Sequence, residues 1–241
     1  MVKSIKFSAT KEYLSLKTNL PKPIKTNIPE WFKKLNHTPT FKTIKGCMPF
    51  LDTLTTGYVL EMPLDLAIEF NIKDNEGKRQ TSFHVSNEYK DPNLNVGSSK
   101  ESHPIRQFKG SPIEKKNLFY DAYKIINPWK IKTPPGYSCL FVPPLNNADD
   151  RFSIIPGIVN TDTFENIINF PFIINSDKYP ILNTILKKGT PYVQVIPFKR
   201  DSWTMKIEEL NMEKRNTMLL DYTLNVFRTY KNKYWNKVLW K

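Results

Sequence analysis

Short apolar runs separated by turn-forming residues dominate the second half of this 241-residue chain. Residues 127–200 contain three such runs, rich in Ile, Val and Phe, with Pro, Gly, Asn and Asp between them. Runs of this length and composition are typical of β-strands rather than helices. We therefore predict that this stretch forms the core of an all-β domain.

A second apolar pattern, with a period of two residues, lies within residues 47–70. The alternating residues are Tyr58, Leu60, Met62, Leu66, Ile68 and Phe70. This period predicts two half-buried strands, and Pro63 with Asp65 marks the break between them. We expect the two strands to form a meander, followed by a hairpin turn at residues 74–77 and a loop over residues 90–110.

The first 46 residues are basic and are predicted to form an N-terminal arm. Residues 4–9 can form a strand, but the prolines at positions 21 and 23 should end any ladder because proline has no N–H donor. Asn27 is placed to cap a short helix over residues 29–35. That helix would be anchored on the core by Trp31, Phe32 and Leu35.

Residues 207–241 consist of good helix formers, without Gly or Pro. A mostly apolar residue recurs at every fourth position, at Met218, Tyr222, Val226, Tyr230 and Tyr234. This spacing predicts a C-terminal α-helix, preceded by one more strand over residues 203–206. The predicted organisation is an N-terminal arm (1–46), a β core domain (47–206) and a C-terminal helix (207–241).

Lys and Arg outnumber Asp and Glu by 36 to 23, and the resulting net charge of +13 favours polyanionic partners such as nucleic acid. The alternative is that an AT-rich genome has enriched Lys, Asn and Ile without a function. The candidate anion-binding residues in the tail are Arg228, Lys231, Lys233 and Lys237. Interleaved Tyr230, Tyr234, Trp235 and Trp240 could stack on bases, or they could dock on the core or on a neighbouring subunit and leave the lysines solvated.

Motifs for many enzyme classes are missing. Cys47 and Cys139 form neither a disulfide framework nor a zinc knuckle, and His37, His84 and His103 lack metal-ligand spacing. The sequence has no Gly-rich phosphate loop and no GxSxG motif, so we expect no metal and no cofactor. It also has no signal-peptide pattern and no apolar run of membrane-spanning length, which predicts a soluble protein of a reducing compartment that does not enter a membrane.

Three segments of the central stretch follow the order of a known family's motifs. They are PPGYSCLFVPP, PGIVNTDTFENIINFPF and KKGTPYVQV. They resemble the motif segments of the trimeric dUTPase and dCTP deaminase superfamily, and TTGYVLEMPLDL is similar to the first strands of those enzymes. The resemblance covers residues 47–200 with one long insertion. It implies a trimer with a β-clip fold, which is a distorted barrel, and a two-sheet jelly roll is the competing architecture.

The resemblance persists at structural positions and fails at chemical ones. The family's triphosphate-holding Arg and Ser fall on Pro144 and Leu145, its water-activating Asp on Asn160, and its sugar-stacking Tyr on Thr163. The retained residues are Gly157, Asp162, Gly189 and Gln194. The nucleotide-binding candidates that the resemblance implies are Ser138, Asn160, Asp162, Phe164 and Gln194. A carboxamide at position 160 cannot accept a proton at neutral pH, so hydrolysis would need another base, such as Asp162 or Asp149.

Segments along the whole chain also resemble proteins of unassigned function from tailed phages of marine bacteria. The similar segments are IPEWFKK, CMPFLDTLTTGY, INPWKIKTPPGYS and QVIPFKR. This resemblance implies a phage origin, and a location in the host cytoplasm or in the virion.

Two functional hypotheses follow from these observations. The first is a catalytically inert β-clip protein that assembles, most simply as a trimer, and acts as a binding or assembly module in a virion or a nucleoprotein complex with nucleic acid or other phage proteins. The second is a nucleotide-binding protein or a dUTP- or dCTP-type hydrolase, in which lysines replace the missing Arg.

Overall fold

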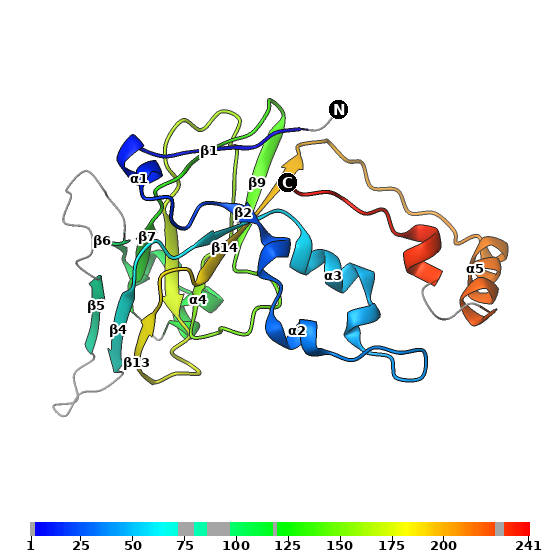
Figure 1. Cartoon of the computed structure of the whole chain (residues 1–241), viewed down its shortest axis with the longest axis horizontal. Helices are drawn as coiled ribbons and strands as arrows, with labels where there is room; N and C mark the ends of the chain where they lie inside the picture. The colour runs from blue at the N-terminus through cyan, green and yellow to red at the C-terminus, as the bar shows by residue number, and fades with distance from the viewer. Residues whose placement is uncertain (1–2, 72–79, 86–96, 118–119, 225–228) are drawn as a thin grey trace.

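The computed structural model describes residues 3–71, 80–85, 97–117, 120–224 and 229–241 (Figure 1). The fold is mainly β, with several antiparallel sheets and a C-terminal helix, as the apolar pattern predicts. The sheets form a body on one side of the molecule, and the C-terminal helix lies away from that body at the end of a long projecting segment (Figure 1).

The largest described sheet has five strands, and all of its pairings are antiparallel. Its order is β11 (Gly157–Val159), β9 (Tyr137–Val142), β14 (Pro191–Lys199), β3 (Tyr58–Glu61) and β2 (Lys22–Pro23). Strand β14 lies at the centre and pairs with both β9 and β3. The strands of this sheet therefore come from three distant parts of the sequence.

Two smaller sheets and a two-stranded ribbon complete the β structure of the described residues. The second sheet has the order β10 (Phe152–Ile154), β12 (Phe170–Ile174), β7 (Ala122–Ile126) and β6 (Gly97–His103). The third sheet has the order β13 (Ile181–Leu186), β4 (Leu66–Asn71) and β5 (Gln80–Val85). The ribbon pairs β1 (Lys6–Ser8) with β8 (Lys130–Lys132).

The helices of the body are short and lie in the connections between strands. They are α1 (Lys11–Ser15), α2 (Glu30–Lys34), α3 (Met48–Thr55) and α4 (Pro112–Lys116), with 3₁₀ turns at Ile24–Asn27, Ile44–Gly46 and Ile105–Phe108. Helix α5 (Met212–Leu224) and a π-helical turn at Tyr230–Tyr234 follow the last strand.

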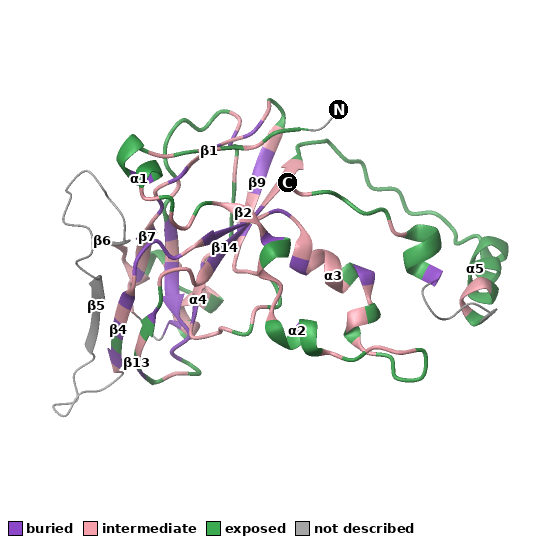
Figure 2. Ribbon diagram, viewed as in Figure 1, coloured by how far each residue is buried: buried purple, intermediate pink, exposed green. Residues whose placement is uncertain are grey.

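The core lies between the sheets, where apolar side chains of several strands are buried (Figure 2). Phe141, Phe170 and Tyr192 form an aromatic chain through it, with ring centroids 5.3 Å and 5.9 Å apart. Along β4, Leu66, Ile68 and Phe70 are buried while the residues between them are not, as the period of two predicts.

The first 46 residues do not form a separate arm, because parts of them are built into the body. Tyr13 and Ile24 are buried in it, and β1 pairs with β8. Pro23 also takes part in a ladder, contrary to the prediction, since Lys22–Pro23 pairs with β3. This strand lies at the edge of its sheet, where a missing N–H donor is tolerated.

The predicted meander between residues 58 and 70 is wrong. Strands β3 and β4 exist, but β3 pairs with β2 and β14, whereas β4 pairs with β5 and β13. The preceding residues 48–55 form α3 rather than β structure, with Pro49 in the first turn, where proline is favoured. Long-range partners have overridden the local hairpin preference here.

The predicted single C-terminal helix is also wrong in its extent. Residues 203–206 form no strand, helix α5 begins at Met212, and residues 235–241 form no helix. The indole N–H of Trp235 donates to both carboxylate oxygens of Asp52 on α3, at 2.9 Å and 3.1 Å. This tertiary contact holds the tail against the body and outweighs its helix propensity.

Two smaller predictions are corrected in the connections. Residues 97–103, predicted as part of a loop, form β6 and pair with β7. Helix α2 is preceded by Pro29 at the N-cap position rather than by Asn27, and Phe32 is its buried anchor while Trp31 is exposed. The hairpin turn predicted at residues 74–77 lies outside the described residues.

We predict that Gly57 cannot be replaced. Its φ is +82°, and a Cβ atom there would lie 2.1 Å from the carbonyl oxygen of Val195 on β14. Gly57→Ala should lower the free energy of unfolding by about 2–5 kcal/mol, from left-handed backbone strain plus a clash. Urea denaturation monitored by circular dichroism measures this loss.

Gly110 is the matched control, since its φ is +79° and an added Cβ would meet no atom within 4 Å. Gly110→Ala should cost only the backbone strain, about 1–2 kcal/mol. Equal losses for the two variants would contradict a steric role for the close approach of Gly57 to β14.

Candidate functional site

Three of the candidate nucleotide-binding residues lie together at one end of β9. Ser138 is on β9, and Asn160 and Asp162 follow β11, which pairs with β9 through Val159 and Cys139. The antiparallel pairing brings the two segments side by side, and the Ser138 hydroxyl donates to Oδ1 of Asn160 at 2.8 Å.

Arg200, which follows β14, joins these residues into one network. Its Nη1 donates to Oδ1 of Asp162 at 2.7 Å and to Oγ of Ser138 at 2.9 Å, and its Nη2 pairs with the other oxygen of Asp162. The backbone completes the network, since Gly136 accepts from the Arg200 N–H at 2.9 Å and donates to Asp162 at 2.8 Å. We call these residues, Gly136, Ser138, Asn160, Asp162 and Arg200, the Arg200 network.

The Arg200 network occupies the polar atoms that a substrate would need. Hydrogen bonding from Arg200 lowers the pKa of Asp162 to about 2, so this carboxylate is a weak base at neutral pH. Oδ1 of Asn160 already accepts from Ser138. The arrangement suits a rigid joint between β9, β11 and β14 better than a general-base site.

Of the other two nucleotide-binding candidates, Phe164 contacts the network through its backbone, and Gln194 lies further along β14. Phe164 is exposed in the turn after Asn160, whose carbonyl oxygen accepts from the Phe164 N–H at 2.9 Å. Gln194 is fully buried on β14, opposite Val142, whereas Ser138 pairs with Phe198 further along the same two strands. Its amide donates to the carbonyl oxygens of Thr53 and Thr56 and accepts from the Leu145 N–H, at 2.8–3.0 Å. Gln194 thus fastens α3 and the loop after β9 to the central strand.

The loop that carries Pro144 and Leu145 offers no substitute for a phosphate-binding Arg. The nearest guanidinium in sequence is that of Arg151, which pairs with Asp149 at 2.7 Å and 2.9 Å. This pairing lowers the pKa of Asp149 below its usual range. Asp149, the other candidate base, is therefore also held as a weakly basic carboxylate.

Cys139 is not placed as a nucleophile in this structure. Cys139 is buried, and desolvation raises the pKa of its thiol to about 11, so it is protonated at neutral pH. Cys47 is half-buried at the start of α3 and forms no disulfide. Among the described residues, no group of three or more His, Cys, Asp or Glu side chains is placed to hold a metal ion.

No helix within the described ranges is both long and apolar enough to cross a lipid bilayer.

Comparison of the sequence with protein-family models and with curated proteins finds no match. The interpretation of the site therefore depends on its own geometry.

The basic tail is only partly free to meet an anion. Lys233 pairs with Asp221 of α5 at 2.7 Å, while Lys231 and Lys237 are exposed, and Arg228 lies outside the described residues. Tyr234 stacks on Tyr222, with centroids 6.1 Å apart. The predicted aromatic–basic surface is therefore split into separate contacts.

Residues 201–224 and 229–234 belong to a projecting arm, which leaves the body after β14 and is held to it again at Trp235 (Figure 1). Every residue from 201 to 220 is exposed, and this part of the arm is green in Figure 2. The Arg200 network holds the start of the arm, and the bond from Trp235 to Asp52 holds its end.

Sequence analysis missed Arg200 and Asp52, the two residues that hold the ends of the arm. Arg200 could have been found from its position at the end of the apolar run over residues 191–198. No local sequence pattern could have identified Asp52, because its partner Trp235 is 183 positions away in the sequence.

We predict that the Asp162–Arg200 pair stabilises the fold above about pH 4 and that this contribution disappears towards pH 2. The pKa of Asp162 is about 2 in the folded state, below the usual unfolded value of roughly 3.9. The contribution is thus complete above the unfolded pKa and is lost as the pH falls through the folded one. Asp162→Asn should be less stable than wild type at pH 7 and nearly equal to it at pH 2, by urea denaturation.

Arg200→Gln provides the control for this pH dependence. In that background, Asp162→Asn should have a much smaller effect at every pH, because the partner is already absent. Parallel stability curves for wild type and Asp162→Asn between pH 7 and pH 2 would contradict the role of the pair.

Proposed function

We propose that this protein is a catalytically inert, self-assembling binding module of phage origin, whose subunits are joined by exchange of the projecting arm. The observation that carries the proposal is the alternation of large, exposed apolar side chains at Trp203, Met205 and Ile207. The resemblance of the sequence segments to the dUTPase and dCTP deaminase superfamily implies a β-clip core and favours three subunits in the assembly.

Three large apolar side chains at the start of the arm are almost fully exposed to water, which is an unfavourable environment for them. Trp203, Met205 and Ile207 are 90%, 82% and 89% exposed. In an extended segment these alternate residues share one face, while Ser202, Thr204 and Lys206 share the other. Burying such side chains stabilises by about 1.5–3 kcal/mol each, so the arm gains most of its stability only against another surface.

Strand β13 supplies a matching surface on a second copy of the chain. It is an edge strand in the described sheet, paired only with β4. Ile181 and Ile185 project from one of its faces and are 69% and 46% exposed. An added strand would pair with the open edge and place its apolar face beside these two isoleucines, which is the mode of strand addition.

The geometry favours exchange between copies over folding back. In Figure 1, the arm projects from one side of the body and β13 lies on the opposite side. Residues 201–211 reach roughly 35 Å when extended, enough to cover the six residues of β13. Donor and acceptor are different patches, so the contact is head-to-tail and closes only as a ring, for which three subunits is our proposal.

Hydrolysis of a nucleotide is the less favoured alternative. Its candidate bases, Asp162 and Asp149, are both ion-paired with an arginine. A structural role also fits the phage resemblance, which suggests that the assembly belongs to a virion or to a nucleoprotein complex in the host cytoplasm.

The arm-exchange proposal predicts that wild type has three times the 28.2 kDa subunit mass in solution. Trp203→Ser/Met205→Ser/Ile207→Ser, the donor variant, should be monomeric because its arm lacks the apolar face. Ile181→Asp/Ile185→Asp, the acceptor variant, should also be monomeric. Light scattering after size exclusion at micromolar concentration measures each mass.

Two controls separate arm exchange from general stickiness. Phe41→Ser removes a side chain that is 61% exposed outside the arm, and this variant should remain a trimer. An equal mixture of the donor and acceptor variants should form a dimer, because one productive contact remains. A monomeric wild type, or trimers of the donor variant, would contradict the proposal.

We also predict that the protein copurifies with the particles of the phage that encodes it. Mass spectrometry of gradient-purified virions provides the measurement, with infected-cell lysate as the control. Abundance in the lysate and absence from the virion would rule out the virion role and favour the nucleoprotein complex.

A further inference from the structure

The two ends of the described chain meet on one face of the largest sheet and enclose a cleft. Tyr58 of β3, Pro197 of β14 and Tyr137 of β9 form its floor, on three adjacent strands. Residues 3–5 and 237–241 form its walls. Its volume is about 520 Å³, within the range of sites that hold a small organic ligand.

Aromatic rings and ammonium groups line this cleft together. The rings of Tyr58 and Trp240 meet edge to face, with centroids 5.8 Å apart, and Nζ of Lys3 lies 5.8 Å from the ring centroid of Tyr137. The hydroxyl of Tyr58 donates to the carbonyl oxygen of Lys241 at 3.2 Å and holds the tail in place. These contacts make the cleft a defined feature of one subunit.

The charged side chains that line the cleft all have the same sign. Lys3, Lys237 and Lys241 are among its lining residues, and the described lining includes no Asp or Glu. Within the described part of the chain, none of the three lysines forms an ion pair. A ligand that fits must therefore combine a flat apolar body with negative charge.

We propose that this cleft binds a nucleotide unit of single-stranded nucleic acid, with a base against the aromatic rings and phosphates near the three lysines. Proteins that bind single strands combine stacking rings with a basic groove in this way. The inference places anion binding at both chain ends together, rather than at Tyr230, Tyr234 and Lys233, whose contacts lie within the arm.

The test is fluorescence anisotropy with fluorescein-labelled dT12 at about 50 and 200 mM salt. If three phosphates are neutralised, affinity should fall about 20-fold over this fourfold salt range, because log K for single strands falls by about 0.7 per phosphate for each tenfold rise in salt. Lys3→Gln/Lys237→Gln/Lys241→Gln, the cleft variant, should bind more weakly and lose most of this salt dependence. Trp240→Leu should weaken binding by roughly tenfold or more, since a stacking face is lost.

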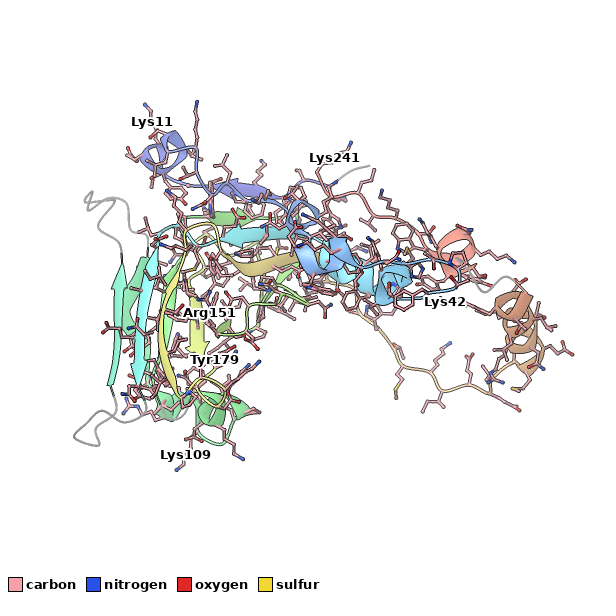
Figure 3. All side chains as sticks on the ribbon, turned by 60° about the horizontal axis from the view of Figure 1, so that its bottom comes forward. Lys11, Lys42, Lys109, Arg151, Tyr179 and Lys241 are labelled. Carbon is pink, nitrogen blue, oxygen red and sulfur yellow. The ribbon has the colours of Figure 1, made fainter. Side chains whose placement is uncertain are left out.

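Lys11→Gln/Lys42→Gln/Lys109→Gln is the matched control variant. These lysines are exposed and lie on other parts of the molecule from Lys241 (Figure 3), and the net charge changes equally. The control variant should keep near-wild-type affinity. Equal losses in the two triple variants would show binding by overall charge and overturn the proposed site, as would a lack of binding by wild type at about 50 mM salt.

Competition identifies the source of the ligand. Displacement of labelled dT12 by dTMP indicates a mononucleotide site, and displacement only by unlabelled dT12 indicates a strand. Vesicles of anionic phospholipid that outcompete dT12 would replace the proposal with a membrane surface. The monomeric donor variant should bind dT12 as wild type does, because the cleft lies within one subunit, so failure of arm exchange leaves this test intact.

Discussion

The pairing of β14 with both β9 and β3 is the constraint on which the rest of the structure depends. The strand is buried along Tyr192–Val195, so each of its polar groups needs a partner within the protein. Gln194 meets this need by bonding to α3 and to the loop after β9. At the C-terminal end of β14, its pairing with β9 places Arg200 next to Asp162. One strand therefore fixes both the helical connection and the base of the arm.

The projecting arm begins where the buried strand β14 ends. After Arg200, the chain leaves the body, and the apolar residues between positions 201 and 220 are exposed on this subunit. The body already has a continuous core in the described residues, so the arm adds nothing to it. An exposed apolar segment held at both ends is an efficient donor, because the anchors limit the entropy that is lost when it docks.

The charged side chains fall into two groups, those that are ion-paired and those that are not. Acidic groups near the arm base, such as Asp162 and Glu165, are paired with Arg200 and with Lys130 and Lys132. Arg200, Lys130 and Lys132 are therefore already paired and less available to a ligand. The net positive charge is carried by lysines for which the described residues show no carboxylate partner. The cleft between the chain ends gathers three of them next to aromatic rings.

The mainly β character of the chain and most strands between residues 127 and 200 could be predicted from the amino-acid pattern. A period of two residues and turn-forming breaks are local properties of the sequence. The strands that they predict form in the fold because burial of the apolar face stabilises them. The order of the family-like segments also grouped five nucleotide-binding candidates, of which Ser138, Asn160 and Asp162 lie together, whereas Gln194 lies further along β14. The pairing of the strands, the position of the tail and the hydrogen bonding of Arg200 to Asp162 could be seen only in the folded structure. These outcomes depend on contacts between residues far apart in sequence, such as Trp235 and Asp52, whose free energy appears only when the chain is folded.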